Sequence, residues 1–371
     1  MSRLSVDCRV RLSPAFELAI AVQIEAGVTI VFGPSGSGKS TLLRCVSGLT
    51  KPDAGVVRIG TRTLFDAERH INVPVEQRRV GYVFQQLALF PHMTVAQNLR
   101  YGLAHVSAAE ARDRIDRIVA SFRIAHLLDR RPGAISGGER QRTALARSLV
   151  TDPDVLLLDE PLSALDHRTQ SLIMDDLRQW NAARQIPILY VTHAHREAFA
   201  LGTRALVVDG GRLIASGTPQ EVLEAPASEP LAQLAGFENF FDSVVRAIAA
   251  DAATMTCGVE GTALTLEVPR LVDAEPGDHV RLAIRAGDVL VATLKPSGLS
   301  ARNVVPGTVR AVRRVGPTVA VDVDAGAPFE AHVTPHACDA LDLRPGTAVW
   351  LVMKTHSCHP VSMRRTTFDT P

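Results

Sequence analysis

The run from Gly33 to Ser40, GPSGSGKS, has residue types and a spacing suited to chemistry on phosphate. It satisfies G-x-x-x-x-G-K-[ST] between an apolar run, GVTIVFG, and a segment with helical apolar spacing, KSTLLRCVSGL. Glycines let backbone N–H groups approach phosphate oxygens, and the helix N-terminus adds positive partial charge. We predict a nucleoside triphosphate site in which Lys39 neutralises the γ-phosphate and Ser40 holds Mg²⁺. Its predicted members are Gly33, Pro34, Ser35, Gly36, Ser37, Gly38, Lys39, Ser40 and Thr41.

Two carboxylates, Asp159 and Glu160, end a second apolar run, DVLLLDE. Ligands of open parallel sheets bind at the C-terminal edge of the strands. Asp159 is therefore the expected Mg²⁺ partner, and Glu160, on the alternate side, is placed to orient or deprotonate the attacking water. Alone, two acids after a strand would equally indicate the start of a helix. Together with the glycine loop they favour hydrolysis.

A second glycine-containing segment, ISGGERQRTALARSL, places Ser136, Gly137 and Gly138 at the start of an amphipathic helix. A helix N-terminus attracts anions. A lone S-G-G is often only a helix cap with a flexible entry. Here the run LVTDPDVLLLDEPLSALD follows it, and that order is far more specific. The chain thus carries two separate candidate phosphate-binding segments.

Composition limits the class of protein to which these motifs belong. A chain of 371 residues that is 46% apolar predicts two domains. Lysine plus arginine (40) balances aspartate plus glutamate (39), so nucleic acid is not an expected partner. No apolar run approaches the roughly eighteen residues of a membrane span, and no signal peptide is expected. The five cysteines lack a C-x-x-C pair and are expected to be reduced thiols.

The pattern along the chain changes near residue 225. Before it, short strands are followed by a mainly helical, charged stretch at about 87–150. The runs DVLLLDE and IPILYVTH then flank an amphipathic helix, which predicts a parallel crossover unit. Beyond 225, Pro-Gly and Gly-Pro turns separate β-like segments, and we place a domain boundary near 236. There PGDHVRLAIR (276–285) resembles PGTAVWLVMK (345–354), which predicts two similar small β-barrels.

The order of these motifs resembles that of the nucleotide-binding subunits of ABC transporters, across residues 1 to about 235. The resemblance implies a P-loop NTPase fold of the α/β class with a RecA-like parallel sheet, an antiparallel β subdomain and a helical subdomain. It makes Ser136, Gly137 and Gly138 the family signature, with Ile135 and Glu139 replacing its commoner Leu and Gln. It also implies a homodimer in which two copies pack head to tail. Each ATP would then lie between the glycine loop of one copy and the S-G-G helix of the other.

The same resemblance implies roles for residues that would be unremarkable alone. Gln85, in VGYVFQQLALFPHMTV, matches the glutamine that senses Mg²⁺ and the membrane partner. Asp166 closes the run Ser163–Asp166, which matches the loop across the dimer interface and contributes to the ATP site. His193, in YVTHAHREA, matches the histidine that contacts the γ-phosphate. Without the family order, Gln85 would be an ordinary surface amide and His193 the end of a strand.

These assignments define a set of catalytic residues and a set of Mg²⁺ ligands, and they leave the contact to adenine open. The expected catalytic residues are Glu160, His193 and Gln85, and the expected Mg²⁺ ligands are Ser40, Gln85 and Asp159. The family usually stacks adenine on an aromatic residue near the N-terminus. Phe16 is the one aromatic residue before Phe32, and we expect it to pack in the core rather than to stack.

The C-terminal region, 236–371, is expected to form an all-β, OB-like barrel domain. Its stretch GLSARNVVPGTV resembles the S-A-R-N segment of the molybdate-binding barrels of molybdate importer ATPases, over about 296–362. Ser300, Arg302, Asn303 and Lys354 could ligate a tetrahedral dianion through charge-assisted hydrogen bonds. The alternative is a structural barrel in which Arg302 is solvated and Asn303 forms a turn. A bound anion would be expected to act as feedback on the ATPase.

Together the resemblances imply an ATP- and Mg²⁺-dependent ATPase subunit of a bacterial importer for molybdate or tungstate. It would lie peripherally on the cytoplasmic side of the inner membrane, on integral membrane permease subunits served by a periplasmic oxyanion-binding protein. The main alternative is the same machine for sulfate, thiosulfate, iron, a polyamine or a sugar. A soluble ABC protein acting on DNA or ribosomes, and an oxyanion store without ATPase activity, are less well supported. Glu160 argues against the store.

Overall fold

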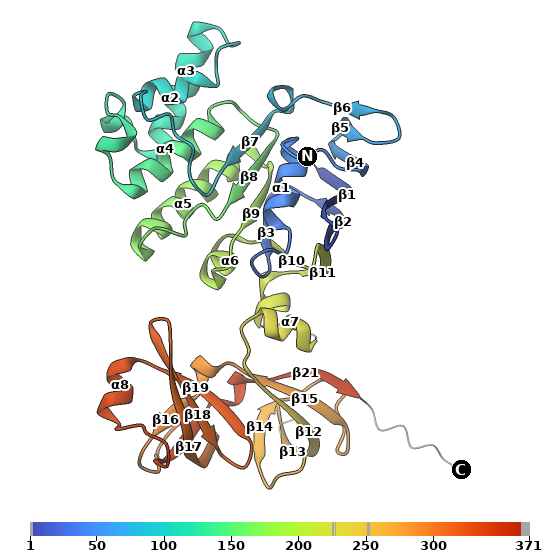
Figure 1. The fold of residues 1–371 in the computed structure, drawn as a ribbon, viewed down its shortest axis with the longest axis vertical. Helices are drawn as coiled ribbons and strands as arrows, with labels where there is room; N and C mark the ends of the chain where they lie inside the picture. Colours follow the sequence, from blue (N-terminus) through green and yellow to red (C-terminus); the bar gives the residue numbers. More distant parts are fainter. Residues whose placement is uncertain (1–2, 225, 227, 251–252, 365–371) are drawn as a thin grey trace. The chain divides into compact units, whose positions relative to one another are not determined.

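The computed structural model describes residues 3–224, 226, 228–250 and 253–364. The chain divides into two compact units, Met1–Val222 and Leu223–Pro371 (Figure 1). The second unit begins before the boundary predicted near 236, because helix α7 (Glu229–Leu234) packs on that unit. Glu229 accepts two hydrogen bonds from Arg281, from Nε and Nη2, each of 3.0 Å.

An eleven-stranded mixed sheet organises the first unit, with the order β6-β5-β4-β1-β2-β11-β10-β3-β9-β8-β7. Strands β10, β3, β9, β8 and β7 pair in parallel, whereas β1, β2, β4, β5 and β6 form an antiparallel part. This arrangement confirms the predicted α/β class. The strands are β1 (Leu4–Ser13), β2 (Phe16–Ile24), β3 (Gly27–Phe32), β4 (Ala54–Ile59), β5 (Arg62–Asp66), β6 (Ile71–Asn72), β7 (Val80–Val83), β8 (Val155–Asp159), β9 (Pro187–Val191), β10 (Arg204–Asp209) and β11 (Arg212–Gly217).

The burial of these strands follows their sequences. Strand β1 alternates buried and exposed positions, as expected of a strand with one face on the core. Strands β8 and β9 are continuous apolar runs, and their apolar residues are buried because helices cover both faces of a parallel sheet. The polar residue that ends β8, Asp159, therefore emerges at the carboxyl edge of the buried sheet.

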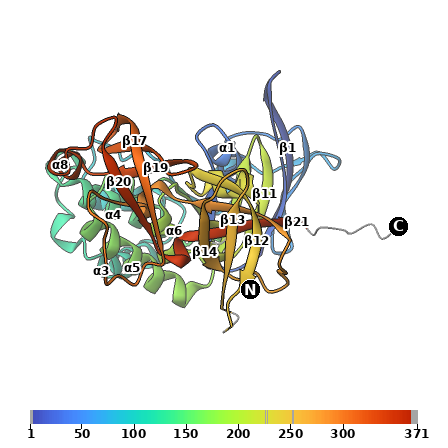
Figure 2. The same cartoon turned by 90° about the horizontal axis from the view of Figure 1, so that it is seen from below.

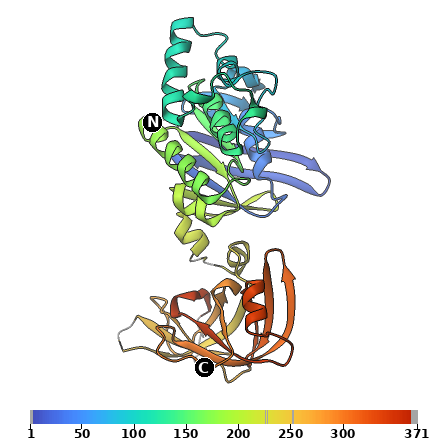
Figure 3. The same ribbon diagram turned by 90° about the vertical axis from the view of Figure 1, so that its left-hand side faces the viewer.

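Four helices of the first unit, α2 to α5, begin after residues whose side chains cap them. Thr94 and Ser136 each form a capping box with the residue three positions later, and Asp166 accepts two backbone N–H groups. Figure 1 shows these helices beside the parallel strands, and Figure 3 shows them from the side in teal and green. The helices are α1 (Lys39–Ser47), α2 (Val95–Tyr101), α3 (Ala108–Phe122), α4 (Gly137–Leu149), α5 (His167–Arg184) and α6 (His195–Leu201).

The second unit contains two five-stranded antiparallel sheets, ordered β14-β13-β12-β15-β21 and β16-β20-β17-β18-β19. Figure 2 shows β12, β13 and β14 side by side in the first of them. The strands are β12 (Asn239–Ile248), β13 (Thr254–Val259), β14 (Thr265–Pro269), β15 (His279–Ile284), β16 (Leu290–Ala292), β17 (Asn303–Val315), β18 (Thr318–Asp324), β19 (Pro328–Val333), β20 (Ala348–Met353) and β21 (Cys358–Arg364), with helix α8 at Pro335–Ala340.

The two sheets exchange their last strands. Strand β16 follows β15 along the chain but pairs with β20, and β21 follows β20 but pairs with β15. The two segments that the sequence analysis matched as a repeat contain β15 and β20, which occupy equivalent places in their sheets. Side chains from both sheets fill one core. The halves are therefore interlocked and cannot separate without losing strand pairing.

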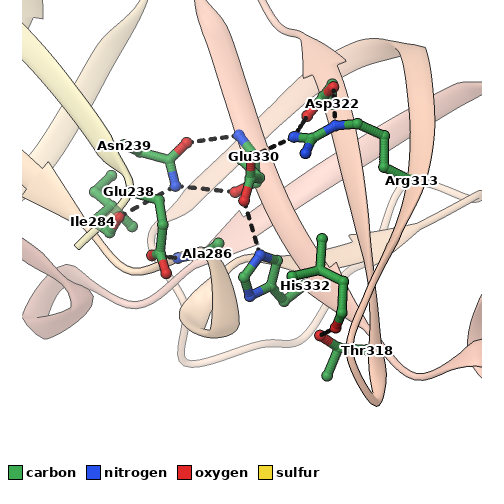
Figure 4. A network of polar contacts seen from close by, with 10 residues as sticks. Glu238, Asn239, Ile284, Ala286, Arg313, Thr318, Asp322, Glu330 and His332 are labelled. Carbon is green, nitrogen blue, oxygen red and sulfur yellow. Dashed lines mark hydrogen bonds and ion pairs between the residues drawn. The ribbon is translucent and has the colours of Figure 1, made fainter. Parts of the chain in front are cut away.

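Two asparagines tie the sheets together reciprocally. Asn239 Oδ1 accepts the Glu330 N–H at 2.6 Å, and its Nδ2 donates to the Glu330 carbonyl at 2.9 Å (Figure 4). Asn303 makes the same pair with Glu267, at 2.7 and 2.9 Å. Each asparagine is the first residue of its strand and is 4% exposed. Both amides therefore satisfy backbone groups of the opposite sheet.

We expect Asn303→Ala to lower the free energy of unfolding by about 2 kcal/mol or more, because the Glu267 N–H and carbonyl lose their partner. Denaturant unfolding of the full chain would measure this. Ser300→Ala, at an exposed position of the same segment, is the control and should change little. Equal stability of the two variants would contradict the proposed bridge.

Candidate ATP site

The glycine loop connects β3 to α1 and needs its glycines. Gly36 and Gly38 have φ angles of 80° and 106°, which side chains disfavour. A Cβ on Gly33 would lie 2.0 Å from the Val208 carbonyl oxygen. The Ser37 hydroxyl is buried and has no hydrogen-bond partner among the described residues. The loop is therefore a tight backbone cradle with an unsatisfied polar group, which suits an oxygen-rich ligand.

The Lys39 ammonium reaches back across this loop. Its Nζ donates to the carbonyls of Gly33 at 2.8 Å and Pro34 at 2.7 Å. Burial lowers the pKa of Lys39, and the charges of Glu160 and Asp159 oppose that shift. A phosphate would offer this cation a stronger partner than two neutral carbonyls. The loop borders a pocket of about 480 Å³ lined by Leu12, Phe16, Ser35, Gly36, Gly38, Lys39, Ser40, Thr41 and Glu160.

We expect Lys39→Ala to weaken ATP binding at least about tenfold, since a buried charge-assisted contact to phosphate is lost. Titration with a fluorescent ATP analogue would measure the affinity. Lys51→Ala removes an exposed cation after the same helix and should bind normally. Unchanged affinity of Lys39→Ala would contradict the assigned role.

Two predicted Mg²⁺ ligands meet in the structure although they are distant in sequence. Ser40 Oγ donates to Asp159 Oδ1 at 3.0 Å. Tyr82 OH donates to the other carboxylate oxygen, Oδ2, at 3.3 Å. Burial and the Asp159 charge raise the pKa of Tyr82, so the phenol stays protonated and remains a donor. Sequence reasoning did not single out Tyr82, whose available signal is its place in VGYVFQQ, on the strand next to β8.

The three predicted catalytic residues converge at Glu160. Gln85 Nε2 lies 3.4 Å from Glu160 Oε2, and His193 Nδ1 lies 3.4 Å from Glu160 Oε1. Glu160 has a φ of 46°, in the left-handed region that side chains rarely adopt. Its N–H donates to the Val191 carbonyl at 3.0 Å, which anchors this strained turn to β9. Backbone strain retained at such a position is typical of functional sites.

A residue that the sequence analysis did not single out shapes the segment after Gln85. Leu87 and Ala88 have φ angles of 59° and 47°. Arg147, on α4, donates to their carbonyls at 3.1 and 2.7 Å and lies over the Phe90 ring. The helix of the S-G-G segment thereby holds the glutamine segment directly.

The S-G-G segment forms the N-terminus of α4. The Glu139 carboxylate accepts the Ser136 N–H at 2.7 Å, and Ser136 Oγ accepts the Glu139 N–H at 3.4 Å. The backbone and side-chain hydrogen bonds from Ser136 hold the pKa of Glu139 below its usual range. A Cβ on Gly138 would lie 2.6 Å from Thr169 Cγ2, so the glycine lets α4 approach α5. Among the described residues that line the ATP pocket, none comes from Ser136–Gly138.

Two other residues have roles that the motifs did not specify. Asp166 caps α5, where its Oδ1 accepts the N–H groups of Arg168 and Thr169, each at 3.0 Å. Hydrogen bonds from Thr169 lower the pKa of Asp166. Phe16 is half-buried against the core and also lines the ATP pocket beside Leu12, so the structure does not separate core packing from contact with the nucleotide.

The candidate oxyanion residues are not equivalent in the structure. Ser300, Arg302 and Lys354 are exposed. Asn303 is buried, and its amide is used by the Glu267 backbone. Asn303 therefore supports the segment rather than presenting a free amide to an anion.

The fold and this site define an ABC-type ATPase. Residues 19–163 match the ABC transporter family and residues 299–360 match the TOBE domain. The molybdenum import ATP-binding protein ModC of Rhizobium meliloti is 43% identical over 360 residues, 95% of this chain and 98% of that protein. The ModC protein of Mesorhizobium japonicum is 39% identical over 345 residues, 92% of each chain. The chain therefore belongs to the family of molybdenum import ATP-binding proteins of ABC transporters.

Solved structures agree with this fold. The cbiO1 protein of Clostridium perfringens, part of the ABC transporter complex cbiONQ, has a TM-score of 0.53 and 30% identity, covering 59% of this chain and 89% of that one. The dimeric bacterial ABC transporter cassette MJ0796 has a TM-score of 0.50 and 28% identity, covering 59% and 99%. Within the described ranges, no helix is long and apolar enough to cross a membrane.

Proposed function

We propose that this chain hydrolyses ATP to drive the import of molybdate or tungstate, attached to permease subunits at the cytoplasmic face of the membrane. The proposal rests on the convergence of Gln85 and His193 on Glu160, beside the cradle that holds Lys39. The relatives that match nearly the whole chain are named for molybdenum import, which supports the choice of cargo.

Residues of this chain divide the work of hydrolysis. Backbone N–H groups of the glycine loop bind phosphate oxygens, and Lys39 exchanges its two carbonyl partners for the γ-phosphate. Glu160 orients the attacking water and accepts its proton, while His193 contacts the γ-phosphate. The oxygen atoms that suit Mg²⁺ are the hydroxyl of Ser40, the carboxylate of Asp159 and the side-chain amide oxygen of Gln85. When bound, Mg²⁺ neutralises phosphate charge.

We propose that the working form is a homodimer with ATP held between the copies. The pocket at Lys39 contains no contribution from Ser136–Gly138 among its described lining, so the S-G-G helix is available to another molecule's nucleotide. The solved cassette MJ0796, similar in fold, is described as dimeric. ATP then joins two chains, and hydrolysis of its γ-phosphate releases them.

We propose that the second unit binds the transported oxyanion and reports it to the ATPase. The exposed Arg302 and Lys354 supply positive charge, and Ser300 supplies a hydroxyl. Calorimetry of the full chain with molybdate, tungstate and sulfate tests this. We expect molybdate and tungstate to release or absorb heat on binding. Lys354→Ala should abolish this heat. Arg344→Ala, which removes an exposed cation elsewhere in the unit, should leave it unchanged. Heat from sulfate alone would favour a different cargo. No heat from any of the three anions would indicate that the second unit has only a structural role.

A further inference from the structure

A buried carboxylate, Glu197, lies four residues after His193 and has no cationic partner among the described residues. Glu197, in the first turn of α6, is 3% exposed. Its Oε2 accepts hydrogen bonds from Tyr190 OH at 2.9 Å and Thr192 Oγ1 at 2.8 Å. Burying a carboxylate is costly, so a site that keeps one between two neutral hydroxyls indicates a specific use.

The hydrogen bonds of Glu197 lead to both sides of His193. Thr192 Oγ1 donates to Glu197 and accepts the Ala194 N–H at 3.0 Å. The Thr192 N–H donates to the carbonyl of Val31 at 3.4 Å, and Val31 lies in β3, the strand that leads into the glycine loop. The backbone immediately before and after His193 is therefore held through one hydroxyl, and Glu197 fixes that hydroxyl.

Helix α6 has no side-chain cap that could hold the backbone around His193 in place of the Glu197–Thr192 link. Its N-cap residue is Ala194, which forms no side-chain cap, whereas α4 and α5 are capped by Ser136 and Asp166. The His193 side chain is 68% exposed, and its contact with Glu160 is a long one of 3.4 Å. The position of the imidazole thus depends on its backbone, and the backbone depends on the link from Glu197 through Thr192.

We propose that Glu197 is a positioning residue for His193, acting through the Thr192 hydroxyl to hold the imidazole against Glu160 and the γ-phosphate site. This inference rests on the role proposed for His193 in hydrolysis. It assigns Glu197 no contact with the nucleotide. Its effect is therefore on the rate of the chemical step and not on the capture of ATP by the glycine loop.

Steady-state hydrolysis by the full chain tests the proposal. We expect Glu197→Ala to lower kcat about tenfold or more, since small displacements of a catalytic group are costly, with KM for ATP within about twofold. Glu197→Gln keeps an acceptor oxygen and should retain most of kcat. Thr192→Val, similar in shape but without the hydroxyl, should reproduce the loss. Tyr190→Phe is the matched control, because it removes a hydrogen bond to the same oxygen but leaves the Thr192 link, so kcat should remain near that of the parent protein.

A double-mutant cycle identifies the route of the effect. If Glu197 acts through His193, Glu197→Ala should change kcat little in a His193→Ala background. Ala194→Asp should restore part of the rate to Glu197→Ala, because aspartate at this position can cap α6. Multiplicative losses in the double variant, or a normal kcat for folded Thr192→Val, would overturn the inference. A normal kcat for His193→Ala alone would instead refute the role proposed for His193. Thermal melting identifies any variant that fails to fold, in which case Thr192→Val decides the question.

Discussion

Replacing Glu160 with glutamine is expected to lower kcat for ATP hydrolysis by about 10²-fold or more while ATP binding persists. Glutamine has the same shape but cannot accept the proton of the attacking water. The glycine loop and Lys39 are untouched, so the phosphate contacts remain. Phosphate release measures the rate, and a fluorescent ATP analogue measures the affinity.

The expected result for Glu160→Gln needs a control for loss of a carboxylate as such. Glu76→Gln changes an exposed glutamate of the same unit and should hydrolyse ATP normally. If Glu160→Gln kept a rate within about tenfold of the parent protein, its side chain would be a structural partner of Gln85 and His193 and not the base.

The second large effect is expected for Ser136→Arg, which should leave ATP binding to the single chain intact and lower hydrolysis about 10²-fold. The arginine side chain would occupy the helix N-terminus that a second copy's nucleotide needs. Loss of the cap of α4 should cost only about 1 kcal/mol of stability. Ser107→Arg removes the corresponding cap of α3, in the same helical region, and should hydrolyse ATP normally.

Mixing two inactive variants separates a shared site from a self-contained one. A dimer of one Ser136→Arg chain and one Lys39→Ala chain contains one site with both halves intact. In an equal mixture about half of the dimers are mixed, and one of the two sites in each of them is intact. Hydrolysis should therefore be recovered at up to about a quarter of all sites. No recovery, with heterodimers shown to form, would mean that each chain supplies both phosphate-binding segments to the same nucleotide.

Residues that act through local spacing could be identified from the sequence. The run Gly33–Ser40 needs only its own glycines and the helix that follows, and Ser136 needs only its place before α4. The alternation in β1 and the apolar runs of β8 and β9 likewise determine which faces are buried, because side-chain direction along a strand is a local property. The parallel crossover unit followed from these patterns, and the α/β P-loop fold from the family resemblance.

Contacts between distant segments required the tertiary structure. Tyr82 meets Asp159 because β7 and β8 are neighbours, and Asn303 binds Glu267 because the two sheets of the second unit face each other. The exchange of β16 and β21 between those sheets leaves no signal in either strand. A residue type and its spacing determine what a side chain can do and which local element carries it. Which partner it meets depends on how the elements pack, and that is settled by the burial of apolar surface across the whole chain.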